Sequence, residues 1–156
     1  MVPIQSLFEA HLNVTNLERS VAFYTEVLGL PLAGIFPDRR GAFVWVARPQ
    51  DGLLGLWEVA DTPQRLSLHI AFRVSLVDVL KAVDALRSRN IEPLDFQAEP
   101  ATEPIVLAWM PAAAIYFRDP DGNLIEFIAM LPDPPRRELG VLNWTQWLAR
   151  FDHPQY

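Results

Sequence analysis

Apolar and polar positions recur in the same order in two halves of the chain. Residues 8–14, FEAHLNV, alternate with a period of two, which predicts a half-buried strand with His11 on its less apolar face. Residues 17–28 then place apolar side chains at helical spacing between Asn16, an expected N-cap, and Gly29, an expected C-cap. Three strand-like stretches follow, near 31–37, 41–47 and 52–59.

The second half repeats this order. Residues 65–74 alternate, and Ser75 or Asp78 opens a helix with an apolar stripe. Further strands are predicted near 92–98, 112–118 and 123–130, with an extra loop over 98–110. Asp119-Pro120-Asp121-Gly122 is typical of a hairpin turn, because proline presets one dihedral angle and glycine accepts a positive φ.

Each half therefore reads βαβββ, which predicts an α+β fold of two similar modules. We expect one domain over residues 1–131, made of the repeats 6–60 and 65–131. Residues 132–156 begin with the linker-like PDPPR and continue into VLNWTQWLARF, a short amphipathic helix able to dock on the body or on a neighbour.

Composition narrows the class of protein. The chain has 156 residues, 51% of them hydrophobic, which is enough for a buried core. No apolar run approaches the roughly 20 residues that cross a bilayer, and the first residues do not resemble a secretory signal. The net charge of −6 argues against nucleic acid as a partner, and the lack of cysteine excludes disulfides. We expect a cytoplasmic protein without a membrane partner.

Two histidines and two carboxylates fall at matching places in the repeats. His11 and His69 lie midway along the first strand of each repeat, while Glu58 and Glu126 lie in the last strands, on apolar faces. Carboxylates are rarely placed on such faces unless they are paired or bound to metal. Imidazoles with carboxylates suit Fe(II), Mn(II), Ni(II) or Zn(II), and three protein ligands would leave room for substrate oxygens. Glu58 is close to a turn and could equally face solvent.

Two longer motifs carry a resemblance to a known family. HLNVTNLERSVAFYTEVLGL and AIYFRDPDGNLIEF resemble the two ends of the glyoxalase, bleomycin-resistance and extradiol dioxygenase superfamily, the vicinal oxygen chelate proteins. The likeness covers residues 6–131. It implies two βαβββ modules in a cupped, incomplete mixed β-barrel around one divalent ion. It also implies that His11, His69 and Glu126 are metal ligands and that Glu58 is a fourth ligand.

The branch of the family is left open among three readings. Glu58 and Glu126 together favour a glyoxalase-I-like isomerase or lyase, in which a metal polarises a carbonyl oxygen and a carboxylate moves a proton. The extradiol branch would use Tyr116 as a hydrogen-bond donor, although Tyr116 could also be a core aromatic. The histidine that this branch has shortly before the tyrosine is replaced here by Leu107-Ala108-Trp109. The third reading is a non-catalytic, drug-binding module with an aromatic groove, for which the candidate lining residues are Trp45, Trp57, Trp109, Phe43 and Phe117.

We therefore expect a metal-dependent enzyme, with Glu58, Glu126 and Tyr116 as its catalytic candidates. Its substrate would be a small, oxygen-rich molecule that binds the ion through two oxygens. We also expect a homodimer.

Overall fold

The computed structural model describes residues 6–49, 51–59 and 67–150. Contacts divide the chain into two compact units, each described here by itself. The first contains Met1–Leu68 and Asp119–Gly122, and the second contains His69–Arg118 and Asn123–Tyr156. Among the described residues, no helix is both long and apolar enough to cross a membrane.

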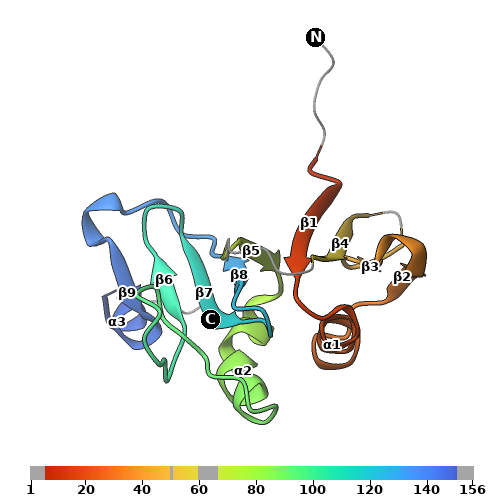
Figure 1. Cartoon of the computed structure of the whole chain (residues 1–156). Coiled ribbons are helices and arrows are strands. Elements are labelled where there is room, and N and C mark those ends of the chain that lie inside the picture. The colour runs from red at the N-terminus through yellow and green to blue at the C-terminus, as the bar shows by residue number, and fades with distance from the viewer. Residues whose placement is uncertain (1–5, 50, 60–66, 151–156) are drawn as a thin grey trace. The chain divides into compact units, whose positions relative to one another are not determined.

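The first unit has one open, mixed sheet in the order β1-β4-β3-β2 (Figure 1). Strand β1 runs parallel to β4, and the other neighbours are antiparallel. Helix α1 packs on β3 and β4. The elements are β1 (Glu9–Val14), α1 (Leu17–Ala22), the π-helical turn η1 (Phe23–Val27), β2 (Leu32–Phe36), the 3-10 turn η2 (Pro37–Arg39), β3 (Gly41–Trp45) and β4 (Leu53–Glu58).

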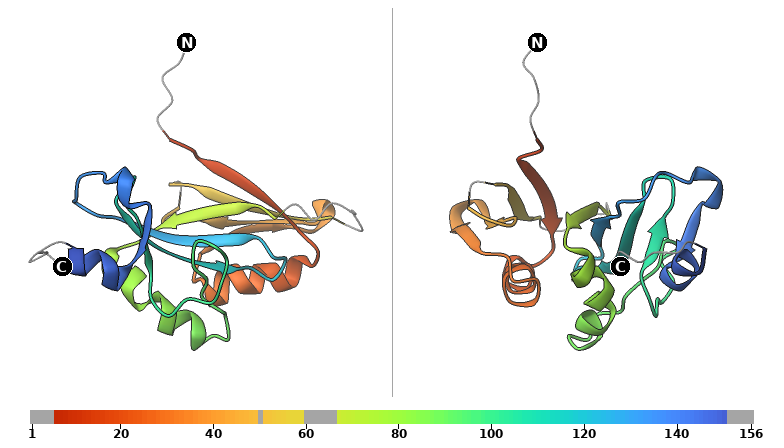
Figure 2. Two further views of the ribbon diagram at one scale, coloured as in Figure 1. Left: turned by 90° about the vertical axis from the view of Figure 1, so that its left-hand side faces the viewer. Right: turned by 180° about the vertical axis from the view of Figure 1, so that it is seen from behind.

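The second unit repeats the same topology, in the order β5-β8-β7-β6-β9. Strand β5 runs parallel to β8, and helix α2 packs on β7 and β8 (Figure 2). The predicted α+β fold of two βαβββ modules is confirmed, with two open mixed sheets. The elements are β5 (His69–Arg73), α2 (Leu76–Arg87), β6 (Ile105–Leu107), β7 (Ala112–Arg118), β8 (Leu124–Met130), the 3-10 turn η3 (Arg137–Leu139), β9 (Val141–Asn143) and α3 (Trp144–Arg150).

The strand expected near 92–98 is wrong. Only Leu94 forms isolated bridges there, with Pro100 and Tyr116. The second strand of the repeat is β6, which lies inside the segment 98–110 that was expected to be a loop. All three residues of β6 are buried, so the strand shows no alternation, and it is too short for a period to be recognised. Of the alternating stretch 65–74, residues 65 and 66 lie outside the described residues, and the strand proper is β5.

Helix α1 begins as expected but ends differently. The Asn16 side chain accepts a hydrogen bond from the amide of Arg19 at 2.8 Å, and Gly29 has a φ of +73°. Between these ends the α-helix gives way to η1, which has wider turns. The change of period turns Phe23 and Tyr24 inward together, beside the buried Ser20.

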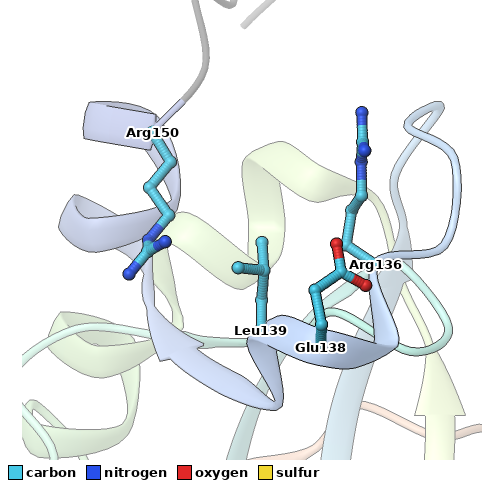
Figure 3. A pocket seen from close by; sticks show the side chains of 4 residues that line it. All are labelled: Arg136, Glu138, Leu139 and Arg150. Carbon is cyan, nitrogen blue, oxygen red and sulfur yellow. The ribbon is translucent and has the colours of Figure 1, made fainter.

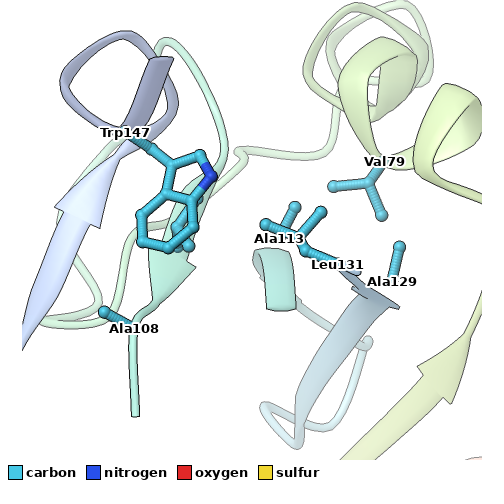
Figure 4. Packing of buried hydrophobic residues seen from close by; sticks show 7 residues of the cluster. Val79, Ala108, Ala113, Ala129, Leu131 and Trp147 are labelled. Atoms are coloured by element: carbon cyan, nitrogen blue, oxygen red, sulfur yellow. The ribbon is translucent and has the colours of Figure 1, made fainter. Parts of the chain in front are cut away.

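The C-terminal segment, expected to be a linker and a short amphipathic helix, has its helix at α3 and forms part of the second unit. Strand β9 pairs with β6 as the fifth strand of the sheet, and Trp147 of α3 is fully buried. Figure 4 shows Trp147 with Val79 and other members of its cluster. Alanines 108, 113 and 129 belong to the same cluster, and their small side chains leave room for the indole.

The turn Asp119–Gly122 is tied to the start of α1 within the first unit. Gly122 has the expected positive φ, +85°, and its amide donates to the Asp119 carbonyl at 3.0 Å. The Asp121 carboxylate accepts hydrogen bonds from Thr15, Ser20 and Arg19. Burial alone would raise the pKa of Asp121, but these hydrogen bonds and the Arg19 charge lower it below its ordinary value.

We expect Asp121→Ala to reduce the free energy of unfolding by about 2–4 kcal/mol, because it leaves several donors without their charged acceptor. The pKa of Asp121 is lowered in the folded state, so its contribution is complete above the ordinary aspartate pKa of about 4 and is lost as the pH falls further. Urea unfolding at pH 7 and at pH 3 measures both effects. Asp84→Ala is the control, because Asp84 is an exposed aspartate on α2. An equal loss for the two variants at pH 7 would contradict the assigned role.

Candidate functional site

His69 and Glu126 come together in the second unit because their strands are parallel neighbours. His69 of β5 is paired with Leu124 of β8, so Glu126 lies two residues further along the adjacent strand, on the same face. Nε2 of His69 is 2.8 Å from Oε2 of Glu126. The structure therefore brings together two of the residues that the sequence singled out as candidate ligands.

Glu126 has one oxygen that is not satisfied. The residue is only 4% exposed, and its Oε1 has no hydrogen-bond partner. The neighbouring surface is apolar, with Leu94, Leu107 and Ala114 in the same region as Leu124. A buried carboxylate oxygen without a partner is costly. This donor set, an imidazole nitrogen beside a carboxylate with a free oxygen, fits a divalent cation.

Tyr116 is the cross-strand partner of Glu126 on β7. Its ring centroid is 5.9 Å from that of His69. Burial raises the pKa of the Tyr116 phenol, and the negative charge of Glu126 raises it further. Burial also raises the pKa of Glu126, although His69 acts in the opposite direction. Tyr116 therefore remains a neutral phenol at neutral pH and can donate a hydrogen bond.

His11 lies on β1 in the first unit, with its side chain about half exposed. Its Nε2 contacts the carboxylate of Glu9. Rings of Phe43 and Trp57 flank the imidazole, with centroids 5.9 Å and 5.6 Å away. The neighbours of His11 in the first unit are thus two aromatic rings. Those of His69 in the second unit are the Glu126 carboxylate and the Tyr116 ring.

Glu58 lies on the other face of the first sheet. It shares its face with the buried Leu54 and Leu56, whereas His11 is paired with Gly55. Its carboxylate accepts a hydrogen bond from Arg40 at 2.6 Å. It also borders a hollow of about 460 Å³ beside α1, lined further by Leu17, Glu18, Val21, Ala22, Thr25, Glu26 and Ile35. The ligand role of Glu58 stays a prediction, and these contacts do not support it.

The strand registers identify which residue of the first repeat corresponds to Glu126. Glu126 lies two positions after the partner of His69, and the residue two positions after the partner of His11 is Trp57. Sequence reasoning named Trp57 only as possible groove lining. The glycine at position 55, which marks a close approach to the strand, was the signal that could have drawn attention to this face.

Neither unit, within its described residues, gathers three or more His, Asp or Glu side chains in a group that could hold a metal ion. A separate hollow of about 210 Å³ lies on the C-terminal segment, lined by Arg136, Glu138, Leu139 and Arg150 (Figure 3). It contains none of the residues that the sequence singled out.

Two βαβββ units with one strand order, and a histidine on the first strand of each, define a glyoxalase-type fold. The model of the Glyoxalase/Bleomycin resistance protein/Dioxygenase superfamily matches residues 6–127, and the chain belongs to this superfamily.

Solved structures agree with this assignment. An integron cassette protein from the mobile metagenome of the Halifax Harbour sewage outfall is 34% identical, with a TM-score of 0.70 over 81% of this chain and 100% of that chain. A glyoxalase/bleomycin resistance protein/dioxygenase from Nocardioides is 26% identical, with a TM-score of 0.63 over 86% of this chain and 89% of that chain. Lactoylglutathione lyase from Agrobacterium tumefaciens, 19% identical, has a TM-score of 0.63 over 81% of this chain and 95% of that chain, and shows the fold alone.

We expect folded Tyr116→Phe and the folded wild type to show the same alkaline titration of tyrosine between pH 7 and pH 11. The reason is that burial and Glu126 raise the pKa of this phenol above its ordinary value of 10. Absorbance at 295 nm reports ionised tyrosine and measures the difference. A smaller absorbance rise in the variant, by the equivalent of one tyrosine, would show that Tyr116 titrates normally. In denaturant, where burial is lost, that difference of one tyrosine should appear.

Proposed function

We propose that the protein is a metal-dependent enzyme of the vicinal oxygen chelate type, in which His69 and Glu126 hold a divalent ion. The observation that carries this proposal is the buried Oε1 of Glu126, which lacks a partner although Oε2 contacts His69. The proposed ion would satisfy that oxygen. With only nitrogen and oxygen donors, the site suits Fe(II), Mn(II), Ni(II) or Zn(II).

His11 is the third ligand in this proposal. Like His69, it lies on the first strand of its repeat, which runs parallel to the last strand of the unit. Half of its side chain is exposed, so the imidazole is accessible. Glu58 is left out of the ligand set, because its face and its ion pair with Arg40 direct it elsewhere. Three ligands leave positions for two oxygens of a small substrate.

The reaction that we propose is an isomerase or lyase reaction at a carbon next to a bound carbonyl. A bound divalent ion supplies polarisation of the carbonyl oxygen. The Glu126 carboxylate accepts the proton from the adjacent carbon through the oxygen that the ion does not hold and, in an isomerisation, returns it to the neighbouring carbon. Tyr116 is the cross-strand neighbour of Glu126, and a hydrogen bond from its neutral phenol would keep the carboxylate oriented.

Ring cleavage is less well supported. The stretch where the extradiol resemblance would have a histidine contains Leu107 and Ala108, which are both buried and have no titratable group. A second candidate function, non-catalytic binding of a small molecule, is favoured by the aromatic rings around His11. Metal content separates it from the enzyme, because the aromatic surface alone needs no ion.

We expect the purified wild type to contain about one divalent ion per chain, and His11→Ala, His69→Ala and Glu126→Gln each to reduce this content at least tenfold. Glu58→Gln is the matched control and should keep its metal, because Glu58 faces α1. Elemental analysis of dialysed protein measures the effect. Full metal content in Glu126→Gln would refute the proposed centre, and loss in Glu58→Gln would restore a fourth ligand.

The metal-loaded protein should isomerise the hemithioacetal that methylglyoxal forms with a small thiol. The absorbance of the thioester product measures this reaction. Glu126→Asp keeps the charge but withdraws the carboxylate by one methylene, so we expect at least a hundredfold fall in kcat. Oxygen uptake with catechol is the opposing assay. Oxygen consumption without isomerisation would overturn the isomerase or lyase proposal in favour of ring cleavage.

A further inference from the structure

We propose that Glu9 is a further metal ligand, which binds the same ion as His11. This inference rests on the proposed function, because it needs the divalent ion that His11, His69 and Glu126 are proposed to hold. It moves the fourth protein ligand of the first repeat from the last strand, where the family resemblance placed Glu58, to the first strand. Each repeat then contributes one imidazole and one carboxylate.

Glu9 and His11 lie on one face of β1. They are two residues apart in a strand, so their side chains point the same way. Oε1 of Glu9 contacts Nε2 of His11, and 37% of the Glu9 side chain and 49% of the His11 side chain are exposed. The other face of the strand carries the buried Leu12 and Val14. The pair is therefore anchored by a packed strand and is open to an ion from solution.

The second unit brings the same two kinds of atom together. Nε2 of His69 lies 2.8 Å from Oε2 of Glu126. Two ligand atoms that are each about 2.1 Å from one ion, at a right angle, are about 3 Å apart, so this separation matches two atoms that share an ion. In both repeats, the Nε2 atom of the histidine is the one that meets a carboxylate oxygen.

The two repeats obtain this carboxylate from different positions. Glu126 comes from the strand beside its histidine, where the first repeat has Trp57. Glu9 comes from two residues before its own histidine, where the second repeat has Ser67. The Ser67 hydroxyl instead donates to a backbone carbonyl. Of these two equivalent positions, each repeat has a carboxylate at one, and that carboxylate contacts the histidine.

Glu9 is available to a cation, whereas Glu58 is engaged. In the part of the chain that the structure describes, the Glu9 carboxylate has His11 as its only hydrogen-bonding partner. Glu58 accepts a hydrogen bond from Arg40 at 2.6 Å, and a metal at Glu58 would have to break this ion pair. Glu9 needs only an ion beside an oxygen and a nitrogen that already meet. With Glu126, it also gives the divalent ion two negative charges.

We expect Glu9→Gln to weaken Zn(II) binding by about tenfold or more, because a neutral amide replaces a charged ligand. Competition with a chromophoric chelator measures the Kd for Zn(II). Glu58→Gln is the matched control and should keep the wild-type Kd, because Glu58 faces α1. Equal Kd values for Glu9→Gln and the wild type would overturn the inference, as would an equal weakening in Glu58→Gln, and either result would leave the metal itself in place. A wild type without measurable affinity for Zn(II) would overturn the proposed function as well.

A second variant distinguishes a ligand from a residue that only orients His11. Glu9→His places a further imidazole where the carboxylate now meets Nε2. Electron paramagnetic resonance of the protein with one equivalent of Cu(II) counts the coordinated imidazole nitrogens. We expect three in Glu9→His and two in the wild type, and the control Glu58→His should also keep two. A count of two in Glu9→His would place position 9 outside the coordination shell and would overturn the inference.

Discussion

The parallel pairing between the first and last strand of each repeat is the constraint on which the candidate site depends. Strand β8, the last strand of the second repeat, lies between β7 and β5. Its residues therefore pair with β5, the first strand of the same repeat. This pairing brings Glu126 within 2.8 Å of His69, 57 residues earlier. A slip of one residue would turn Glu126 to the other face of the sheet, beside the helix.

The turn Asp119–Gly122 supports that register from outside the sheet. It closes the hairpin of β7 and β8, which sets Tyr116 opposite Glu126. Both of its carboxylates also accept hydrogen bonds. Asp121 accepts them from Thr15 and Ser20, and Asp119 accepts one from the Tyr24 hydroxyl. The sequence DPDG thus combines turn geometry with hydrogen-bond acceptors for Thr15 and Ser20 at α1 and for Tyr24 in η1.

Much of the fold could be predicted because the long elements have clear periods. The alternation around His11, the caps of the two main helices and the turn before Glu126 all depend on local chemistry. Strand β6 could not be predicted, since its three residues are all buried, and the change to π-helix at Phe23 has no pattern of its own. Burial of Trp147 depends on β9 and on distant alanines, which local patterns do not reveal.

Sequence patterns alone do not show which residue of the first repeat corresponds to Glu126. Sequence alternation placed Glu58 correctly on the face of Leu54 and Leu56, but that face belongs to α1. Only the register with β1 shows that the adjacent Trp57 shares a face with His11. Because side chains alternate at every step of a strand, the neighbouring residue faces the opposite way. The two repeats therefore share their topology and their histidine but differ in chemistry: one offers aromatic surface, and the other offers a buried negative charge.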